Sequence, residues 1–435
     1  MKGMRWLVQG LSTVVLLVVA VWAVSRLWPQ NRAQREAVAL LEQAAPQPGS
    51  NAFARLWLLG YDGIADDRLD ALLSEDVALH RQALAALPAD AYPGVPAFES
   101  VAARRYEPVA GMENFCSWRE PGCLRKVRLD ETRVAAALEG QQALLQRIAR
   151  LAQDGHYRNP FAPDVAMLMP PFQLLTRALP AHALAHVQGR SAEALQGLCT
   201  DTLTARLLMS HSDSLVAAMI GAAMVEGNAA LLGDVLAELP RQYPLPDVCH
   251  RAFVPAMASE LAICQPMRGE FALSSAAIGH FSSWPQGLLL DREKTRGRIA
   301  RQMAWPCGKD ALAALADDRP VRAPAVSTSR WQLECAANPV GCILSAIAGP
   351  AYADYPLRLQ DAGAHLRLVA ALLWLREQPG DGPLETLLAR LPAGLADGPR
   401  KIRVSEDGRS LQLDRYGLKQ GAVLSVPLPE GLARP

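Results

Sequence analysis

A long run without charge lies near the start of the sequence. The twenty residues Trp6–Ser25 carry no charged side chain, and their second half, Val14–Val24, is continuously apolar. A helix of this length, at about 1.5 Å per residue, spans the ~30 Å hydrocarbon core of a bilayer. A cleaved signal peptide is the alternative, because Val21–Ala23 is a passable cleavage site. Signal peptides have shorter apolar cores of about 7–15 residues, so the pattern favours an uncleaved transmembrane anchor.

Beyond this run, apolar positions recur with helical spacing over most of the chain. In the segment 131–153, for example, Val134, Leu138 and Leu145 lie along one side of a helix. Turns that contain Pro or Gly separate such segments. The sequence therefore predicts a mainly α body, with helices over residues 34–45, 51–59, 69–87, 131–153, 173–239, 249–262, 310–316, 342–348, 361–378 and 383–391.

The region 173–239 has the most regular pattern. It contains ALPAHALAHVQGRSAEAL and AAMIGAAMVEGNAALLGDVL, and each is interpreted as a helix, a glycine turn and a second helix. The two turn glycines, Gly189 and Gly227, lie 38 residues apart. Small residues before each turn and a leucine-containing pair after it resemble a tetratricopeptide helical hairpin. We therefore expect stacked, tetratricopeptide-like α-hairpins in the body.

The pattern changes to an alternation near the last residues. Residues 401–405 and 411–414 alternate, and Asp407-Gly408 between them is a hairpin turn signal. Residues 422–426 are expected to add a third strand. The predicted organisation is a cytoplasmic tip and transmembrane anchor over residues 1–30, a helical periplasmic domain over residues 31–398, and a C-terminal β-hairpin with a tail over residues 399–435.

The composition and net charge of the chain indicate which class of partner to expect. Half of the residues are hydrophobic and 20% are charged, which is typical of a globular chain rather than a disordered one. Lysine and arginine together number 44 and aspartate and glutamate 43, so the net charge is +1. A protein that binds nucleic acid through its whole surface carries a basic excess. We therefore expect no nucleic-acid partner.

Eight cysteines bear on the cellular compartment. None forms a C-x-x-C pair, but Cys116–Cys123 in CSWREPGC and Cys335–Cys342 in CAANPVGC share one spacing. Both loops contain Pro and Gly and can fold back, as a disulfide requires, because its two Cα atoms lie within about 7 Å. The alternative is eight small buried apolar side chains. Bonds are predicted in these two loops, and the pairing stays open for Cys199, Cys249, Cys264 and Cys307.

The flanking charges alone do not orient the anchor. Positive charges lie on both sides of it: Lys2 and Arg5 before it, and Arg26, Arg32 and Arg35 after it. The positive-inside rule therefore does not determine the orientation of the anchor. The predicted disulfides decide the orientation, because such bonds persist in oxidising compartments. We expect a single-pass protein that is held in the inner membrane by Trp6–Ser25, with the bulk of the chain in the periplasm.

Several short stretches carry a resemblance to known proteins. They are Ala52–Tyr61 (AFARLWLLGY), Cys123-Leu124 with Tyr157–Pro160, Ser212–Leu215, and Asn338–Gly341 with Ala348–Tyr352. These stretches resemble a family of single-pass, membrane-anchored, mainly helical proteins of Gram-negative bacteria. The last helix pair and hairpin are similar to a C-terminal segment of many bacterial anchored proteins, although Asp397-Gly398-Pro399 replaces its usual Asp-Pro-Phe-x-Gly. The resemblance implies topology and fold, and it brings no activity and no active-site residues.

Two groups of residues suggest catalytic or metal chemistry, and both have a structural interpretation. His182 and His186 are four positions apart on a predicted helix, so both imidazoles share one face, as zinc ligands can. Their H-A-L-A-H sequence lacks the glutamate of the zinc-protease motif H-E-x-x-H. Ser210–Ser214 contains Ser, His and Asp, but adjacent side chains point apart and suit a cap for a helix beginning at Leu215. We expect no catalytic residue, no metal ligand and no cofactor.

The flanks of the first cysteine loop are basic and aromatic. Together they would present a rigid surface to an acidic partner or to anionic headgroups, and the alternative is a solvated surface beside a closed loop. The residues predicted to bind a partner are Arg104, Arg105, Tyr106, Trp118, Arg125, Lys126 and Arg128.

These observations favour a non-enzymatic interaction protein that is held at the inner membrane and faces the periplasm. Two versions are an immunity-type inhibitor of an envelope-targeting toxin and a scaffold for an envelope complex. The alternative is an envelope hydrolase or metal-dependent enzyme that uses His182 and His186. A bound metal ion or a polar cleft would favour the enzyme, and an adjacent toxin gene would favour the immunity role.

Overall fold

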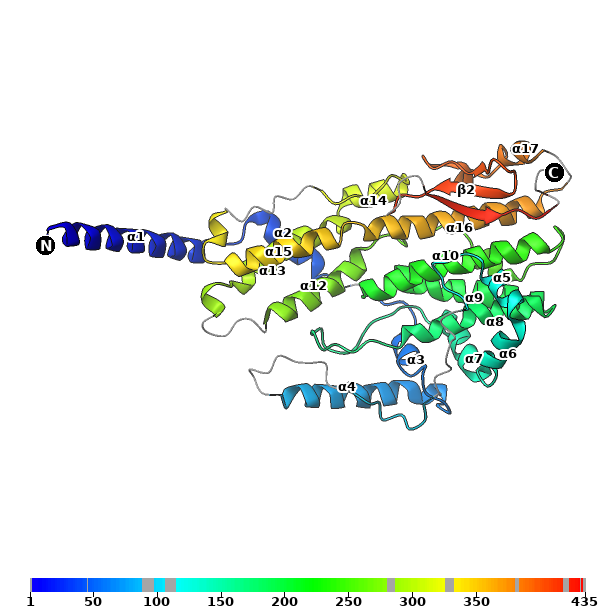
Figure 1. Ribbon diagram of the computed structural model, residues 1–435, viewed down its shortest axis with the longest axis horizontal. Coiled ribbons are helices and arrows are strands. Elements are labelled where there is room, and N and C mark those ends of the chain that lie inside the picture. Colours follow the sequence, from blue (N-terminus) through cyan, green and yellow to red (C-terminus); the bar gives the residue numbers. More distant parts are fainter. Residues whose placement is uncertain are drawn as a thin grey trace.

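The computed structural model describes residues 2–44, 46–87, 98–105, 115–279, 286–324, 332–379, 383–417, 422–430 and 432. It is mainly helical and contains a small antiparallel sheet, as the sequence predicts. Figure 1 shows an elongated body of long helices, with the first helix projecting from one end and the sheet lying toward the other.

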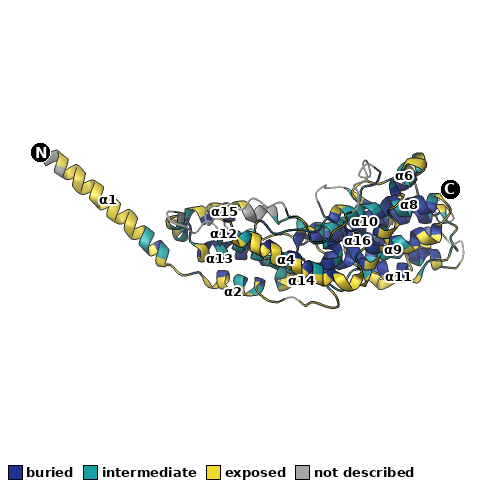
Figure 2. Ribbon diagram, turned by 90° about the horizontal axis from the view of Figure 1, so that it is seen from below, coloured by how far each residue is buried: buried dark blue, intermediate teal, exposed yellow. Residues whose placement is uncertain are grey.

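Helix α1, Lys2–Leu27, is the predicted apolar helix. Its segment Trp6–Leu27 is long and apolar enough to cross a membrane, and 0% of its most apolar stretch is buried. Helix α10, Leu215–Glu238, passes the same test of length and composition, but 67% of its most apolar stretch is buried. Figure 2 shows the contrast, with α1 exposed along most of its length and the central helices buried. Helix α1 is therefore the segment that could anchor in a membrane, and α10 is a core helix.

Four helices form the core of the body. Helix α8 (Ala178–Val187) packs on α9 (Ser191–Ser210), α9 packs on α10, and α10 packs on α16 (Tyr355–Glu377). Side chains such as Leu198 and Leu232 are fully buried between these helices. Burying one leucine contributes about 1.5–3 kcal/mol, so this layer supplies much of the stability of the fold.

The structure contains one of the two predicted glycine turns. Gly189 lies between α8 and α9 with a φ of 78°, a left-handed conformation that glycine adopts without strain. Gly227 instead lies inside α10. A Cβ atom there would lie 2.7 Å from the Cα atom of Trp118, so glycine at this position permits close packing rather than a turn. The prediction of a second hairpin is wrong, and a tetratricopeptide-like arrangement is not confirmed.

The connection between α9 and α10 runs from His211 to Ser214. Ser214 is the N-cap of α10, and its Oγ accepts a hydrogen bond from the backbone N–H of Ala217 at 3.3 Å. The prediction that this polar segment caps a helix beginning at Leu215 is therefore confirmed.

The other helices surround this core. Helices α2 (Arg32–Leu41), α12 (Cys264–Gly279), α13 (Arg292–Met303) and α15 (Pro339–Ala351) form a group near α1, in which α13 packs on the other three. The remaining α-helices are α3 (Phe53–Trp57), α4 (Leu69–Ala85), α5 (Cys123–Leu129), α6 (Glu131–Leu138), α7 (Gln142–Arg150), α11 (Asp247–Ala252), α14 (Lys309–Ala316), α17 (Leu384–Leu388) and α18 (Ala393–Ala396). Short 3₁₀ helices are η1 (Asp66–Arg68), η3 (Leu151–Gln153), η4 (Phe172–Arg177), η5 (Gln286–Leu288), η6 (Trp305–Cys307) and η7 (Leu333–Cys335).

Two predicted helices are interrupted by glycine or proline. The segment predicted as one helix over 131–153 is divided into α6 and α7, because Gly140 between them has a φ of 73°. The helix predicted over 249–262 ends at Ala252. Pro255 follows three residues later, and proline both lacks the N–H of a helical bond and disfavours helical geometry at the residue before it.

Helices α12 and α13 were outside the predicted set. Helix α13 buries the polar side chains of Lys294, Arg298 and Gln302 against its neighbours. Its buried face therefore shows no apolar periodicity, which is the signal that sequence reasoning uses to find a helix.

The C-terminal sheet has the strand order β1-β2-β3, and both pairs are antiparallel. The strands are β1 (Arg403–Val404), β2 (Ser410–Asp414) and β3 (Val423–Pro427), and Gly408 at the predicted turn has a φ of 72°. The predicted strands are therefore confirmed. The sheet packs on α10 and α16, so it shares a core with the helices.

Candidate functional site

A cleft of about 660 Å³ opens beside the first disulfide loop, and it is termed the loop cleft below. This volume lies within the range of about 300–1,000 Å³ that is usual for ligand sites. Segments far apart in the sequence contribute to it: the loop itself, η4, the first half of α10, α12 and the beginning of α16. It is lined by Cys116, Ser117, Trp118, Arg119, Thr176, Leu215, Val216, Met219, Ile220, Ala223, Glu270, Tyr352, Tyr355 and Arg358.

The disulfide loop forms one wall of the cleft. Cys116 and Cys123 are bonded, with their Cα atoms 5.0 Å apart, and Gly122 turns the chain with a φ of 84° before α5 begins. Trp118 packs on α10 where Gly227 leaves space for its backbone and ring. The bond thus fixes an aromatic side chain at the edge of the cleft.

The first half of α10 forms an apolar floor. Val216, Met219, Ile220 and Ala223 follow the i, i+3, i+4, i+7 spacing of one helix face. Val216 is 50% exposed and the other three are half-buried, although the residues on either side of this face are buried in the core. The described part of the chain therefore leaves an apolar helix face partly uncovered.

Two arginines border this floor. The guanidinium of Arg358 lies over the ring of Tyr355, with its Cζ atom 5.3 Å from the ring centroid. Its Nε atom is buried and has no hydrogen-bond partner in the described part of the chain. Arg119, on the disulfide loop, is exposed at the opening. Arginine donors at the edge of an apolar floor suit a ligand that carries a carboxylate or another anion.

The acidic residue of the cleft is Glu270 of α12. Burial raises the pKa of its carboxyl group, although the backbone N–H of Leu215 acts in the opposite direction. Burial also raises the pKa of Tyr352, and the nearby Glu270 carboxyl raises it further. The lining contains two arginines, Arg119 and Arg358, and one carboxyl group, so its basic groups outnumber its acidic one.

Two of the predicted basic residues are engaged in ion pairs. Arg128 donates two hydrogen bonds to Glu238, at 2.8 and 2.6 Å, and this contact lowers the pKa of the Glu238 carboxyl. Lys126 pairs with Glu120 at 2.9 Å. Arg125 is exposed beside Gly122. These contacts stabilise the surface around α5 and do not direct the charges into the loop cleft.

The predicted residues upstream of the loop belong to a different cavity. Arg105 donates from Nε to the hydroxyl of Tyr61 at 3.1 Å, and its guanidinium lies over the Tyr61 ring. Both residues line a separate cavity of about 360 Å³. Arg104 is exposed, and Tyr106 lies outside the described residues. Of the seven predicted partner-binding residues, Trp118 lines the loop cleft.

The two histidines considered as zinc ligands have separate partners. His182 contacts Asp201 through Nε2 at 2.7 Å. His186 contacts the Ser191 hydroxyl through Nδ1 at 2.9 Å and Glu238 through Nε2 at 3.1 Å. Among the described residues, no group of three or more His, Cys, Asp or Glu side chains could hold a metal ion.

The row of Ser191, His186 and Glu238 contains the residue types of a hydrolase triad. Its ring nitrogens are used in the opposite sense, because the serine of a triad contacts Nε2 and the carboxylate contacts Nδ1. Ser191 is buried at the first position of α9, and Glu238 is also bound by Arg128. These contacts link α8, α9, α10 and α5, so their role is to hold the four helices together.

The segment Ser210–Ser214 is likewise used for structure. The Ser210 hydroxyl donates to the carbonyl of Arg206 at 2.7 Å, and Ser214 caps α10. The expectation that adjacent side chains point apart is wrong for one pair, because Ser210 Oγ lies 2.6 Å from His211 Nδ1. Burial raises the pKa of the Asp213 carboxyl to about 6, although the backbone N–H of Asn159 stabilises its charged form.

All eight cysteines are bonded. The two pairs that sequence reasoning left open are Cys199–Cys249, which joins α9 to α11, and Cys264–Cys307, which joins α12 to η6. The fourth bond, Cys335–Cys342, closes the second short loop, with Cα atoms 5.8 Å apart.

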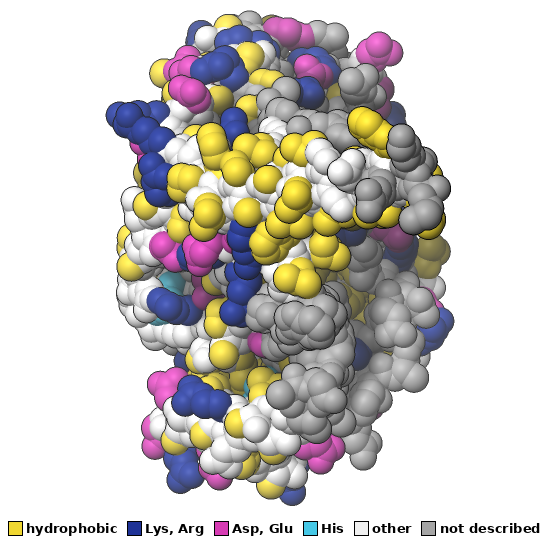
Figure 3. Space-filling view, turned by 90° about the vertical axis from the view of Figure 1, so that its left-hand side faces the viewer, with side chains coloured by type: hydrophobic (Ala, Val, Ile, Leu, Met, Phe, Trp, Pro, Cys, Tyr) yellow, Lys and Arg dark blue, Asp and Glu magenta, His cyan; other side chains and the backbone are white. Residues whose placement is uncertain are grey.

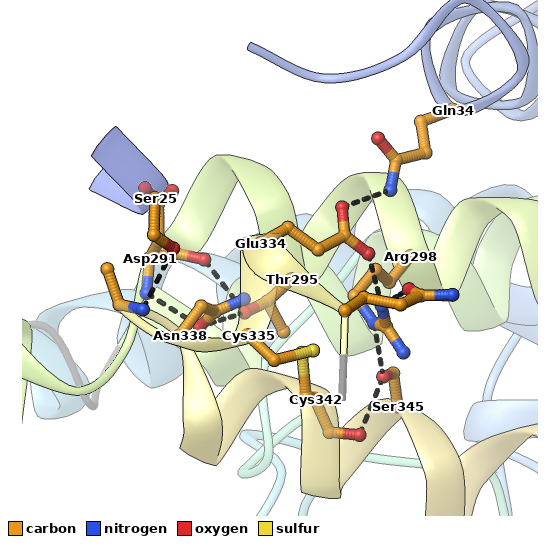
Figure 4. The surroundings of a disulfide bond; sticks show 12 residues. Ser25, Gln34, Asp291, Thr295, Arg298, Glu334, Cys335, Asn338, Cys342 and Ser345 are labelled. Atoms are coloured by element: carbon orange, nitrogen blue, oxygen red, sulfur yellow. Dashed lines mark hydrogen bonds and ion pairs between the residues drawn. A yellow bond between two sulfur atoms is a disulfide. The ribbon is translucent and has the colours of Figure 1, made fainter. Parts of the chain in front are cut away.

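The second short loop lies where α1 meets the body, and this region is termed the anchor junction (Figure 4). Arg298 of α13 donates to Glu334 and, through Nε at 3.1 Å, to the Ser345 hydroxyl. Gln34 of α2 donates to the same glutamate at 3.1 Å. Asn338 accepts from the backbone N–H of Asp291 at 2.8 Å. Polar groups of α2 and of α13 with its N-cap residue are thus hydrogen-bonded to residues in and beside this loop.

Sequence reasoning missed most of the loop cleft. Glu270 lies on α12, which has no clear apolar period, and Tyr355 and Arg358 lie on α16, far from the loop in sequence. The available signals were Arg119 inside the cysteine loop and the i, i+3 spacing of Tyr355 and Arg358. Neither signal indicates which distant segments meet.

No protein family model matches the chain, and neither a curated protein nor a solved structure matches it.

Proposed function

We propose that the protein is a non-enzymatic interaction protein, anchored in the inner membrane by α1, whose periplasmic body binds a segment of an envelope protein in the loop cleft. The bound segment presents apolar side chains to α10 and an acidic group to Arg119 and Arg358. The observation that carries this proposal is the partly uncovered apolar face of α10 beside an arginine whose Nε has no hydrogen-bond partner in the described part of the chain.

The chemistry of the cleft supports protein recognition. Tryptophan, tyrosine and arginine are the residue types most enriched at the energetic centres of protein interfaces, and Trp118, Tyr355 and Arg358 lie together here. The disulfide and the packing of Trp118 on Gly227 hold one wall rigid before a partner arrives. A preformed wall reduces the entropy lost on binding.

Two further observations support the compartment and the anchor. Four disulfides join all eight cysteines, a pattern that is typical of an oxidising compartment such as the periplasm. Helix α1 has the length and composition of a membrane span and exposes its apolar side chains. A fusion of alkaline phosphatase after Pro435 is expected to be active. A stably expressed but inactive fusion would place the body in the cytoplasm.

The partner decides between two versions of this function. An immunity-type protein would use the loop cleft to hold an envelope-targeting toxin, and a scaffold would use it to hold a component of an envelope complex. The cleft and the anchor serve both versions. The identity of the bound protein distinguishes them.

Photo-crosslinking in living cells tests the proposal. The photoreactive residue benzoylphenylalanine replaces Val216 on the cleft floor, and Leu129, which is 82% exposed on α5, is replaced as the control. We expect a defined crosslink to an envelope protein at position 216 and not at position 129. The product should be lost in Arg358→Met and retained in Arg319→Met, because Arg319 is an exposed arginine that pairs with Asp317 outside the cleft.

Equal protein products at positions 216 and 129 would show that the cleft has no special role. If the crosslink at position 216 persists in Arg358→Met, then binding does not depend on an acidic group of the partner that contacts Arg358. Mass spectrometry of the captured protein then separates a toxin from a structural component of the envelope.

A further inference from the structure

The last turn of α1 is built into the body. Ser25 is fully buried, and its Oγ accepts a hydrogen bond from the backbone N–H of Ala337 at 2.9 Å. Lys294 of α13 donates from Nζ to the carbonyl oxygens of Ser25 and Arg26, at 2.6 and 2.8 Å. These carbonyls belong to the C-terminal end of a helix, where intrahelical donors run out and positive charge is favourable.

The lysine that caps α1 is itself fixed. Lys294 is 4% exposed, and its Nζ pairs with Asp291 at 3.1 Å. Asp291 also pairs with Arg26 at 3.5 Å, so one carboxylate joins the end of α1 to the beginning of α13. Helix α1 therefore leaves the body in a set direction, rather than through a flexible linker.

This docking sets the height of the body along α1. The indole Nε1 of Trp22 donates to the backbone carbonyl of Leu288 at 3.1 Å, so Leu288 lies level with Trp22. Trp22 precedes Leu27, the last residue of the candidate span, by five positions. At about 1.5 Å per residue, the Leu288 segment reaches roughly 7–8 Å below the end of the span.

Apolar side chains gather beside this segment and along the helix that begins there. Leu288 and Leu289 are 44% and 51% exposed, and the carbonyl of Leu289 accepts from the backbone N–H of Val340 at 3.2 Å, which places α15 beside them. On α15 the face with i, i+3, i+4, i+7 spacing is apolar and exposed, and Ile347 on it is 69% exposed. Figure 3 looks toward the end from which α1 projects, and the band of apolar side chains in its foreground includes those that α1 exposes.

We propose that this surface is a second membrane contact. It is termed the apolar foot and consists of Leu288, Leu289, Val340, Ile343, Leu344 and Ile347. The foot inserts into the interfacial layer of the leaflet through which α1 enters the periplasm. The protein then lies on the bilayer with a fixed orientation, in the manner of an interfacial amphipathic helix attached to a transmembrane one.

The position of the foot identifies its occupant as lipid. The foot is continuous with the surface of α1, because Trp22 and Leu288 are hydrogen-bonded across their boundary. If Trp6–Leu27 spans the bilayer, the Leu288 segment cannot stay in water without lifting the last turns of the apolar helix out of the membrane. This inference rests on the membrane anchoring proposed above and is independent of the loop cleft.

Photo-crosslinking of the full chain in native membranes tests the foot. Benzoylphenylalanine is placed at Ile347, in a second variant at Leu289, in the anchor at Val15, and in a control at Leu129, whose helix α5 lies at the far end of the body (Figure 1). After irradiation, mass spectrometry measures lipid adducts. We expect lipid adducts at Ile347 and Leu289 with yields comparable to those at Val15, and background yields at Leu129.

The outcomes separate the foot from the anchor. Lipid adducts at Val15, with only background or a protein product at both Ile347 and Leu289, would overturn the foot and leave the anchor intact. Absence of lipid adducts at Val15 would overturn the anchor and the foot together. Retention of the four disulfides in each variant, checked by non-reducing peptide mapping, shows that the body has folded.

Discussion

The two short disulfide loops of this protein are closed in the same way and surrounded differently. Cys116–Cys123 and Cys335–Cys342 have the same sequence separation, and each loop contains Pro and Gly. The first borders an open cleft with an apolar floor and arginines at its edge. The second lies in the anchor junction, where Glu334, Asn338 and Ser345 are bound by neighbouring segments.

The difference shows that cysteine spacing predicts a disulfide but does not predict whether it serves binding or structure. A closed loop of this length is rigid in both places, and the groups around it decide what the rigidity serves. At the first loop, an arginine Nε has no hydrogen-bond partner within the described residues, so rigidity can serve recognition of another molecule. At the second loop, Arg298 binds Glu334, and Ser25 of α1 accepts from the backbone N–H of Ala337, so rigidity holds α1 against the body. The Asn338 Nδ2 atom in this loop is buried without a hydrogen-bond partner among the described residues, but the other polar contacts there are internal.

The largest expected effect is at the anchor junction. Lys294→Met leaves Asp291 without its buried partner and the last carbonyls of α1 without their cap. Removing one member of a buried pair costs about 3–5 kcal/mol, so we expect a loss of about 3 kcal/mol in unfolding free energy. Denaturant unfolding of the full chain in detergent measures it, with Lys309→Met at an exposed position as control. Equal stability of the two variants would mean that Lys294 does not hold the junction.

Removing each disulfide compares the loops directly. The variants are Cys116→Ser with Cys123→Ser, and Cys335→Ser with Cys342→Ser. Both loops have the same length, so loop-closure entropy predicts a similar loss of about 2–3 kcal/mol for each. The first variant should keep its helical circular dichroism and lose partner capture, and the second should keep partner capture. Loss of capture in both variants would contradict the assignment of recognition to the first loop.

The pH dependence of Asp213, which lies just before the cleft floor, should have a definite sign. Burial raises its folded-state pKa to about 6, above its ordinary value of 3.8, so the folded protein holds a proton that the unfolded chain releases. Ionising this buried carboxyl group therefore lowers the unfolding free energy. The loss is absent below about pH 4, grows as the pH rises, and is complete above about pH 6.

The variant Asp213→Asn should therefore be more stable than the unmodified protein by about 1–3 kcal/mol above pH 6, and equally stable near pH 4. Urea unfolding at the two pH values measures this difference. Asp407→Asn is the control, because its exposed carboxyl has its pKa lowered by the Ser405 hydroxyl and gives no such gain. A gain for Asp213→Asn that is equal at both pH values would rule out burial of the ionised group.

The smallest effect is expected for the basic surface around α5. Arg128 and Glu238 are 49% and 39% exposed, and ion pairs of this kind contribute about 0–1 kcal/mol. Arg128→Met should thus change neither stability nor partner capture by a large factor. A strong loss of capture would extend the binding surface from the loop cleft to the basic residues that the sequence suggested.

The sequence predicted those parts of the fold that depend on local signals. The apolar run gave α1, the left-handed turn at Gly189 followed from its position between two helical segments, and Asp407-Gly408 marked the hairpin. Gly227 misled the prediction because a glycine in a helix interior also serves close packing, here with Trp118.

The two candidate sites needed the structure because their signals are not local. The loop cleft joins Trp118, Glu270 and Arg358 from three distant segments. The anchor junction depends on α13, whose buried side chains include Lys294 and Arg298, and a buried polar face has the sequence pattern of a solvated one. Apolar periodicity alone therefore cannot predict either site.

Binding of the captured envelope protein to the purified full chain tests the central claim most directly. The dissociation constants of Arg358→Met and Arg319→Met are compared with that of the unmodified protein. A hydrogen bond to a charged group is worth about 1.5–3 kcal/mol, so Arg358→Met should weaken binding about 10- to 100-fold while Arg319→Met leaves it unchanged. Equal affinities for all three proteins would contradict the assignment of the loop cleft as the binding site.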